Sequence, residues 1–410
     1  MNRIEKLIAE LCPNGVEWKK LGEVTHSIRT GLNPRNNFKL NTPGATNYYV
    51  TVKEITTGKI LFSDKTDKID DDALKIIQKR SNLELGDVLF SGIGTIGKVA
   101  LVDIEPKNWN CSESVFILKP KKDILIPKYL VYILQSNSLT SQFLKQSVGS
   151  TLQGVRMSTL SNISIPIPPL PIQEEIVKIL DTFTALEAEL EAELEARKKQ
   201  YEYYRNKLLT PVEHNGRWYL NGKEVEWKKL GEVCVSISAG GDLPKNYIKS
   251  QKYPTEEYPY PIYSNGVGVN ALYGFSDGYT IDLEAVTISA RGTIGYHTIR
   301  QPKFTPIVRL ITLIPNKQVI TTKFLNYILD ITEIVHSGGS IPQLTVPDVK
   351  KIPIPIPPLS EQERIVAILD KFDALVNDLT SGLPAEIEAR RKQYEYYRNK
   401  LLQFPPFQKC

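Results

Sequence analysis

Two stretches of the chain have the spacing of catalytic motifs. Phe90–Gly97 reads FSGIGTIG and fits G-x-G-x-x-G, the pattern of loops that hold a dinucleotide or S-adenosylmethionine. Such a loop needs a strand before it and a helix after it, whereas Lys98–Val102 (KVALV) is typical of a second strand. The matching copy, Ala290–Gly295, lacks the first glycine. We therefore interpret Phe90–Gly97 and its copy Ala290–Gly295 as tight turns between strands.

The second stretch, Phe404–Phe407 (FPPF), resembles the D/N-P-P-F/Y motif of amino-methyltransferases. That motif needs Asn or Asp first, because its oxygens accept hydrogen bonds from the target amino group, and Phe404 cannot do this. The sequence also lacks metal-ligand spacing of histidines, a C-x-x-C pair, a Walker lysine motif and a nuclease signature. We expect no catalytic residue, metal site or bound cofactor in this chain.

Long polar side chains gather in loops rich in Gly and Asn, and these types read DNA: Arg pairs with guanine, Asn and Gln with adenine, and Lys mostly meets phosphate. The candidates in the first half are Arg29, Thr30, Asn33, Arg35, Asn36, Asn37, Ser91, Thr95, Lys98, Ser150, Gln153 and Arg156. Those in the second half are Lys245, Asn246, Ser264, Asn265, Arg291, Thr293, Ser340 and Gln343.

Composition and charge are compatible with a DNA-binding protein. Of 410 residues, 41% are hydrophobic and 24% charged, which excludes a disordered or disulfide-scaffold chain. The net charge is +5, but residues 172–209 and 361–402 carry −3 and −1, so the rest carries +9. No window approaches 18 apolar residues, and the N-terminus carries Glu5 and Glu10. We expect a cytoplasmic protein with no membrane partner.

The chain contains an internal repeat. VEWKKLGEV occurs at Val16–Val24 and Val225–Val233, and QYEYYRNKLL occurs at Gln200–Leu209 and Gln393–Leu402. Each copy begins with a segment rich in β-branched and aromatic residues. Strands are expected at Tyr48–Ile55 and Val286–Ile288, and short helices at Pro127–Gln135 and Thr322–Asp330.

Each copy ends in a long amphipathic helix that a proline-rich IPIPP segment precedes. In the first helix, Leu186, Leu190 and Leu194 continue an apolar seam suited to a partner helix, and two tandem LEAE units occupy Leu186–Glu193. The second helix is four residues longer between aligned positions, about one turn. It carries Pro384, which we expect to break or kink it.

The expected fold is α/β (α+β), with two mixed, strand-rich domains separated by two long antiparallel helices and an internal pseudo-twofold repeat. The expected divisions are an N-terminal helical segment 1–15, domain 16–165, helix 166–210, linker 211–224, domain 225–354, helix 355–403 and tail 404–410.

These repeats and helices together resemble the specificity subunit of type I restriction-modification systems, in the branch with four-residue tandem helical repeats. The resemblance covers nearly the whole chain. It implies two target-recognition domains, each reading half of a split DNA site with an unread spacer. It also implies two adenine methyltransferase (modification) subunits docked on the helices and restriction/translocase subunits joined to that core. S-adenosylmethionine, ATP and Mg would belong to those partners.

The recognition segments differ in length: Trp18 to Pro169 is 151 positions and Trp227 to Pro358 is 131. Different reading surfaces on one scaffold predict an asymmetric target. The repeated QYEYYRNKLL suits a partner-docking surface, although it could equally complete the seam between helices. Its candidate docking residues are Tyr201, Tyr204, Arg205, Tyr394, Tyr397 and Arg398.

Three other functions stay open from the residues alone. One is a single-chain restriction-methyltransferase, against which the missing catalytic motifs argue. Another is an adaptor associated with a methyltransferase that binds DNA without restriction activity. The last is a two-headed adaptor for protein or RNA, which salt-dependent binding to one particular DNA sequence would exclude.

Overall fold

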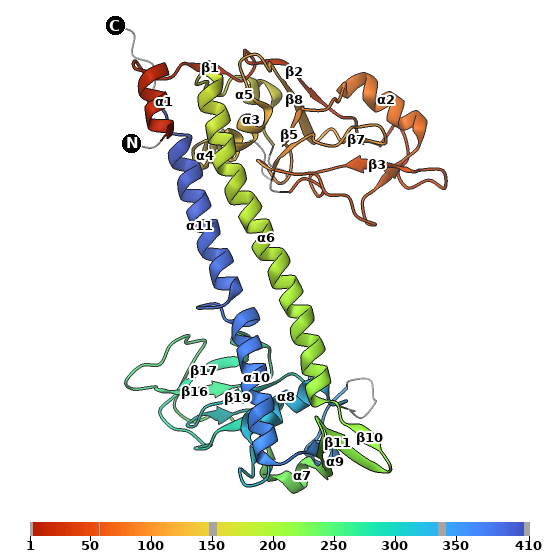
Figure 1. The fold of residues 1–410 in the computed structure, drawn as a ribbon, viewed down its shortest axis with the longest axis vertical. Helices are drawn as coiled ribbons and strands as arrows, with labels where there is room; N and C mark the ends of the chain where they lie inside the picture. Colours follow the sequence, from red (N-terminus) through yellow and green to blue (C-terminus); the bar gives the residue numbers. More distant parts are fainter. Residues whose placement is uncertain (1–2, 57, 147–153, 335–341, 406–410) are drawn as a thin grey trace. The chain divides into compact units, whose positions relative to one another are not determined.

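The computed structural model describes residues 3–56, 58–146, 154–334 and 342–405 of the protein. The chain divides into two compact units (Figure 1). Unit 1 comprises Met1–Leu190 and Ile387–Cys410, and unit 2 comprises Glu191–Glu386. Each unit therefore contains one expected recognition domain together with parts of the expected long helices.

Unit 1 is a mixed α+β body whose elements follow the expected strand-rich pattern. Its helices are α1 (Arg3–Leu11), α2 (Asp71–Ser81), α3 (Pro127–Leu134), α4 (Asn137–Gln146) and α5 (Met157–Ser161). Its strands are β1 (Trp18–Lys20), β2 (Thr25–Thr30), β3 (Asn47–Val50), β4 (Lys68–Ile69), β5 (Val88–Ser91), β6 (Val99–Leu101), β7 (Trp109–Cys111), β8 (Val115–Pro120) and β9 (Ser164–Pro166).

Unit 2 repeats most of this order. Its strands are β10 (Val212–His214), β11 (Arg217–Leu220), β12 (Lys223–Glu224), β13 (Glu226–Lys229), β14 (Cys234–Ala239), β15 (Tyr247–Lys249), β16 (Tyr260–Tyr263), β17 (Leu272–Ser276), β18 (Ala285–Ser289), β19 (His297–Arg300), β20 (Thr305–Pro306), β21 (Leu310–Pro315) and β22 (Pro353–Ile356). Its short helices are α7 (Leu230–Val233), η1 (Gly268–Ala271), α8 (Thr322–Ile331) and α9 (Val346–Lys351).

The same sheet occurs once in each unit, which confirms the repeat at the level of topology. Unit 1 holds the antiparallel order β2-β8-β5-β6, and unit 2 holds β14-β21-β18-β19. Beside it, β3 runs parallel to β7, and β16 runs parallel to β20. The main difference is α2, which packs on β7 in unit 1 (Figure 1). The equivalent segment 277–284 of unit 2 contains no helix.

The short helices were predicted more closely than the strand Tyr48–Ile55. Helices α3 and α8 confirm the expected helical segments. The strand ends at Val50, because the Glu54 carboxylate accepts hydrogen bonds from the Thr51 N–H and hydroxyl, each at 2.8 Å, and closes a turn.

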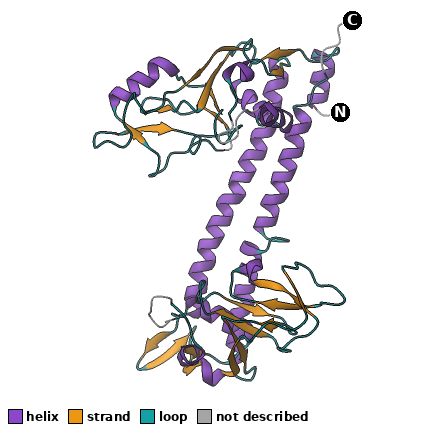
Figure 2. Cartoon of the chain, turned by 180° about the vertical axis from the view of Figure 1, so that it is seen from behind, coloured by secondary structure: helices purple, strands orange, loops and turns teal. Residues whose placement is uncertain are grey.

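The first long helix, α6 (Leu170–Leu209), is continuous over 40 residues and begins in unit 1. The second is interrupted in unit 2, between α10 (Leu359–Asn377) and α11 (Leu383–Leu401) (Figure 2). Asp378 fixes this break, because its carboxylate accepts from the Thr380 N–H at 2.7 Å and from the hydroxyls of Thr380 and Ser381. These bonds lower the pKa of Asp378 to about 2. The expected break is present; Pro384 itself lies in the first turn of α11, where proline is tolerated.

The segment expected to be a linker, 211–224, contains the three-stranded sheet β10-β11-β12. Its two turns are Asn215-Gly216 and Asn221-Gly222, and all four residues have positive φ, between 51° and 81°. Asn-Gly pairs favour the tight hairpin turns that need this backbone conformation, so the sheet has a local cause in the sequence.

A buried glutamine fastens each recognition domain to its long helix. The Gln173 side chain is 0% exposed and donates to the carbonyls of Ile124 (2.8 Å) and Pro168 (2.7 Å), and it accepts from the Ile126 N–H (2.9 Å). Gln362 makes the equivalent three bonds in unit 2. All these backbone groups would lose their partner if the amide were removed, so the junction is specified twice by the same chemistry.

Candidate DNA interface

The sheet topology brings the candidate loops of unit 1 to one end of the sheet. Because the strands are antiparallel, the end of β2 and the end of β5 both lie beside the start of β8, at Thr30↔Phe116 and Ser91↔Val115. The loop after β2, the loop between β5 and β6, and the loop before β8 therefore all lie at the same end of the sheet, where these strands begin or terminate. Unit 2 repeats this arrangement, with Ala239↔Ile311 and Ser289↔Leu310.

The glycine-rich stretch of unit 1 is a hairpin loop. It connects β5 to β6, which pair in antiparallel register, so the strand–turn–strand interpretation is confirmed and the helix that a cofactor loop requires is absent here. Ser91 is 0% exposed; its hydroxyl donates to the Thr95 carbonyl (2.6 Å) and accepts from the Lys98 N–H (2.8 Å). The Ser91 hydroxyl thus holds the loop closed, whereas Thr95 is exposed at the tip.

The loop after β2 contains the most accessible candidates of unit 1. Arg29, Arg35, Asn36 and Asn37 are exposed. Asn33 is half-buried and donates to the Glu113 carboxylate, which fixes the loop against the start of β8.

Two candidates of unit 1 have intramolecular partners that the sequence did not reveal. Thr30 is only 9% exposed, and its hydroxyl accepts from Arg80 at 3.3 and 3.4 Å. The Lys98 ammonium group donates a hydrogen bond to the Val52 carbonyl at 2.9 Å. Arg80, at the end of α2, is an exposed cation at this edge that sequence reasoning missed, because its partner lies 50 residues away.

A further segment joins the hairpin loop in both units. The Val155 N–H donates to the Gly92 carbonyl (2.8 Å), and the Leu344 N–H donates to the Ala290 carbonyl (2.9 Å). Arg156 directly follows Val155, and Gln343 directly precedes Leu344. Both side chains are exposed. Three other candidates fall outside the described residues: Ser150, Gln153 and Ser340.

In unit 2 the structure gathers candidates around Arg291. The Asn265 amide donates to the Arg291 carbonyl (3.0 Å), and Ser264 donates to the Asn265 side chain (3.1 Å). Both residues therefore shape the hairpin loop that carries Arg291 and the exposed Thr293.

Asn246, in the loop before β15, donates to the Asp277 carboxylate (2.8 Å), whereas its neighbour Lys245 is exposed. Sequence reasoning missed Arg309, whose side chain is exposed. The backbone carbonyl of Arg309 accepts a hydrogen bond from the Ala290 N–H (2.9 Å). Its φ of 73° is uncommon for a residue other than glycine and points to a locally imposed backbone conformation.

The residues expected to dock a partner divide into two groups. Arg205 and Arg398 face their own units: Arg205 lies 3.9 Å from Asp330, and Arg398 donates to Asn137 (3.3 Å). Tyr201 is half-buried and Tyr394 is buried beside these arginines. These four residues contribute to the packing within each unit.

The outward group has the same geometry in both copies. Tyr204 stacks on Phe372 and Tyr397 stacks on Phe183, with ring centroids 5.6 and 5.5 Å apart. Both tyrosines remain 37% exposed. Their neighbours Tyr203 and Tyr396, not singled out from the sequence, are 59% and 60% exposed and carry Lys207 and Lys400 over their rings.

The apolar seam is weak at the LEAE units. Leu186 is 42% exposed, and Leu190 and Leu194 are half-buried. Beside Leu186, Glu187 forms an ion pair with Arg391 at 2.6 Å within unit 1. The seam expected to be apolar is therefore partly ionic here.

The remaining chemical candidates serve the fold. Phe404 is 7% exposed and belongs to the hydrophobic core of unit 1, while Pro406 and Phe407 lie outside the described residues. Within residues 3–56, 58–146, 154–334 and 342–405, no three His, Cys, Asp or Glu side chains form a group that could hold a metal. No helix in this part of the chain is both long and apolar enough to span a membrane.

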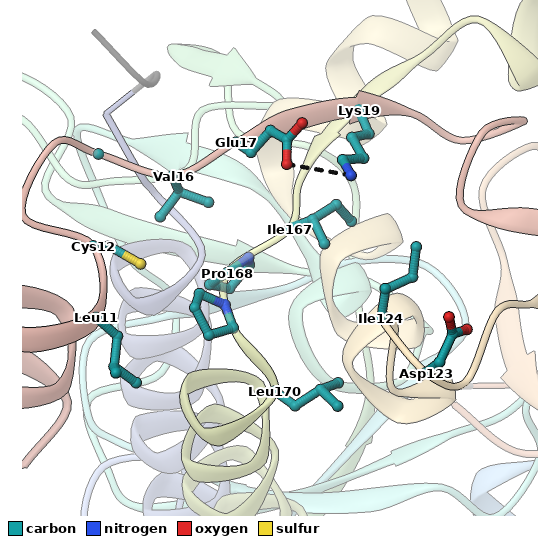
Figure 3. Close-up of a pocket in the computed structure, with 12 residues that line it drawn as sticks. Leu11, Cys12, Val16, Glu17, Lys19, Asp123, Ile124, Ile167, Pro168 and Leu170 are labelled. Atoms are coloured by element: carbon teal, nitrogen blue, oxygen red, sulfur yellow. Dashed lines mark ion pairs between the residues drawn. The ribbon is translucent and has the colours of Figure 1, made fainter. Parts of the chain in front are cut away.

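Unit 1 has a hollow lined by Asp123 and Ile124, which follow the end of β8 (Figure 3). Because Thr25 pairs with Pro120, this is the end of the sheet opposite the candidate loops. The apolar side chains of Leu11, Val16, Ile124 and Leu170 line much of it, and the Glu17–Lys19 ion pair (3.2 Å) borders it. Unit 2 repeats that ion pair as Glu226–Lys228 (3.0 Å). The ion pair that borders the hollow is therefore part of the repeated scaffold, whereas Leu11 of α1 belongs to unit 1 alone among the described residues.

Each unit therefore carries the same sheet, with exposed polar side chains on the loops at one of its ends. The family described as "Type I restriction modification DNA specificity domain" matches residues 13–196 and 222–389. The chain belongs to this family, as the sequence motifs predicted.

Several known proteins are similar over most of the chain. The specificity subunit of the type I restriction enzyme EcoR124I/EcoR124II from Escherichia coli is 32% identical, with coverage of 99% of this chain and 98% of the relative. A type I specificity subunit of Mycoplasma pneumoniae is 36% identical, with coverage of 74% and 89%.

Solved structures share the fold. A chain from a study of assembly and conformational transition of the type I R-M system gives a TM-score of 0.61 at 21% identity, with coverage of 95% of this chain and 98% of that chain. The S subunit from M. genitalium gives 0.53 at 20% identity, with coverage of 95% and 96%. As a specificity subunit, the chain recognises DNA sequence and acts with methylase and restriction subunits, to which the enzymatic activities belong.

Proposed function

We propose that this subunit reads an asymmetric, bipartite DNA site, one half with each unit, and positions two adenine-N6 methyltransferase subunits on it. The observation that carries the proposal is the duplicated sheet end. Both units direct the same set of loops from the same edge, yet the polar side chains on those loops differ: Arg35, Asn36 and Thr95 in unit 1, against Lys245, Arg291 and Arg309 in unit 2. Equal scaffolds with unequal readers suit two different half-sites.

The loops have the chemistry that both tasks of DNA binding need. Exposed Arg and Lys side chains neutralise phosphates, and Arg or Asn side chains reach base edges in the major groove. Asn33, Asn265 and Ser91 serve differently, because their hydrogen bonds hold the loops in place. The reader is therefore preorganised by polar residues that the same loops supply.

The helix ends provide two equal docking surfaces. Tyr203, Tyr204 and Lys207 on α6 have the same exposure and ring geometry as Tyr396, Tyr397 and Lys400 on α11. Exposed tyrosines beside a cation are typical of interface hot spots. Two identical surfaces would bind two copies of one partner, which supports a complex with two modification subunits.

Co-expression with the modification subunit, followed by mapping of modified adenines across host DNA, tests the reading function. We expect one split sequence with a fixed unread spacer and two unlike halves. A continuous recognition sequence, or modification without sequence preference, would refute the bipartite proposal.

Measuring the molecular mass of the complex between this chain and the modification subunit tests the docking surfaces. The substitution Tyr203→Ala should remove one modification subunit, and the double variant Tyr203→Ala, Tyr396→Ala should remove both. Tyr253→Ala, at a residue that is 78% exposed in a loop of unit 2, is the matched control and should leave the mass unchanged. An intact complex with the double variant would place the docking surface elsewhere.

A further inference from the structure

Unit 2 presents apolar side chains at the edge where a DNA-reading surface is expected to be polar. After β16, Val267 precedes η1 and is 49% exposed, and Val269 in the first turn of η1 is 87% exposed. They alternate with glycines in the sequence Gly266-Val267-Gly268-Val269, and Gly268 has a φ of 58°. The two exposed valines lie two residues apart, so this segment offers an apolar contact beside the polar candidates at the same end of the sheet.

This valine loop (Gly266–Val269) is held rigidly against the hairpin loop of Arg291. The Gly268 N–H donates to the Tyr296 hydroxyl (3.0 Å), and the Gly266 N–H donates to the Ser289 hydroxyl (3.4 Å). The preceding Asn265 donates to the Arg291 carbonyl (3.0 Å). The valines are thus fixed relative to a base-reading candidate, with Arg309 joined to the same hairpin through Ala290.

Unit 1 lacks this feature at the equivalent position. The loop after β3 contains Lys53, which is exposed, and turns back through the bonds between Thr51 and Glu54. Its neighbour Val52 is half-buried, and the carbonyl of Val52 accepts from Lys98. The same segment of unit 1 exposes Leu61 (57%), so what distinguishes unit 2 among the described residues is a pair of exposed valines two residues apart.

We propose that Val269, with Val267 beside it, recognises the 5-methyl group of a thymine in the half-site of unit 2. In the major groove, the thymine methyl is the one apolar group that a base pair presents, and apolar side chains distinguish it there. The neighbouring Arg291 and Arg309 supply the charge that a DNA surface attracts. This inference rests on the proposed function, because it requires that the loops of unit 2 face base edges.

Replacing thymine by deoxyuridine tests the inference, because only the methyl group is lost and base pairing is kept. The assay uses the full complex with its modification subunits and duplexes of the mapped target, with one thymine changed at a time. We expect about a fourfold loss of affinity at one or two thymines of a single half-site, the value of burying one methyl group. The variant Val269→Ala should bind more weakly and should no longer distinguish thymine from deoxyuridine there.

The matched control is Val235→Ala, which changes a valine that is 71% exposed at the start of β14, the opposite end of the sheet. It should keep the wild-type sensitivity to deoxyuridine. A half-site of unit 2 without an A·T pair would overturn the inference. The inference would also be overturned if the wild-type complex bound every deoxyuridine duplex as tightly as the thymine duplex. That result would hold as well for valines that insert between base pairs and bend the DNA.

The variant Arg291→Ala separates this inference from the proposed function. If Arg291→Ala relaxes the half-site while deoxyuridine has no effect, only the role of the valines is wrong. If neither change alters recognition, the assignment of the loops as readers fails as well.

Discussion

The two ends of each sheet differ in how closely they are repeated between the units. At the scaffold end, Gln173 and Gln362 make the same three hydrogen bonds. Tyr132–Asp181 and Tyr327–Asp370 likewise fasten the short helices α3 and α8 to the long ones. At the loop end, unit 1 adds α2 with Arg80, whereas unit 2 exposes Val267 and Val269.

This difference shows where sequence change is tolerated. The scaffold groups are buried and bonded on several sides, so a substitution there leaves backbone partners unsatisfied. The loop residues extend from a fixed edge and can change without disturbing the core. On the proposed function, substitutions in these loops would alter the DNA sequence that is read while the scaffold contacts stay intact.

Lengthening α6 should have the largest effect on the target sequence, because it changes the distance between the two units and leaves the loops of both units unchanged. One further LEAE unit after Glu193 adds about 6 Å and turns the following residues by about 40°. The helical twist of DNA is about 34° per base pair, which is close to the turn of about 40° of the lengthened helix. The rotation therefore favours a spacer that is wider by one base pair. We expect the original target to be lost and both half-sites to be kept at the new spacing, as mapped by modified adenines.

Inserting only LEA at the same place is the control for this experiment. Three residues turn the helix by about 300°, which moves the seam away from its partner and should abolish activity. Deletion of Leu190–Glu193 should narrow the spacer by one base pair or abolish activity. A changed half-site with an unchanged spacer would contradict the role of the helix as a ruler.

Arg35→Ala and Arg291→Ala sharpen the comparison between the two readers. Each should weaken or relax recognition of its own half-site, by about 1–3 kcal/mol for a bidentate contact with a base. Binding to duplexes that carry substitutions in one half-site at a time measures the effect. Lys317→Ala, at a surface lysine after β21, is the control and should be silent. Equal losses at both half-sites would argue against separate readers.

Gln173→Ala and Gln362→Ala test whether the scaffold end is equally important in both units. Each substitution leaves three buried backbone groups without a partner, and each should lower the free energy of unfolding by about 1–3 kcal/mol. Denaturant unfolding of the full chain measures this loss. A large loss for one variant and none for the other would show that the repeated contacts are not energetically equivalent.

A smaller effect separates unit 2 from unit 1. His297 donates to the Gly295 carbonyl or Asp330 through its two ring nitrogens, at 2.9 and 3.2 Å. Burial opposes its charge, but the bonds to Asp330 and Gly295 prevail and raise the pKa of His297 above 6.5. Val99 occupies the equivalent strand position in unit 1 and does not titrate.

A raised pKa in the folded state means that the stabilisation is complete below the unfolded pKa and disappears as pH rises through the folded pKa. We expect the free energy of unfolding to fall as the pH rises above about 6.5, because the charged His297 that this pair stabilises is then lost. Asp330→Asn should flatten that slope. An identical slope in the variant would assign the pH dependence to other groups.

Patterns within short stretches of sequence predicted much of the fold. The repeats, the continuous helix α6, the break before Pro384 and the hairpin at Gly94 all depend on local spacing or on proline and glycine chemistry. The sheet at 211–224 had an equally local signal in its two Asn-Gly pairs, which the linker interpretation overlooked.

The candidate interface was less predictable, because it depends on contacts between distant residues. Nothing in the sequence near Thr30 indicates that Arg80 occupies its hydroxyl, and nothing near Ser91 shows that its hydroxyl closes its own loop. The orientation of a helical tyrosine also depends on its neighbours, so Tyr203 and Tyr396 became evident as exposed residues only from the fold. Tertiary pairing decides which polar side chains remain available to DNA.

Exchange of residues 18–165 for the matching segment of a relative tests most directly that one scaffold carries two independent readers. The exchanged chain, co-expressed with its modification subunit, is assayed by mapping modified adenines in host DNA. We predict that one half-site changes completely, while the other half-site and the spacer stay the same. A change in both half-sites together would contradict the account.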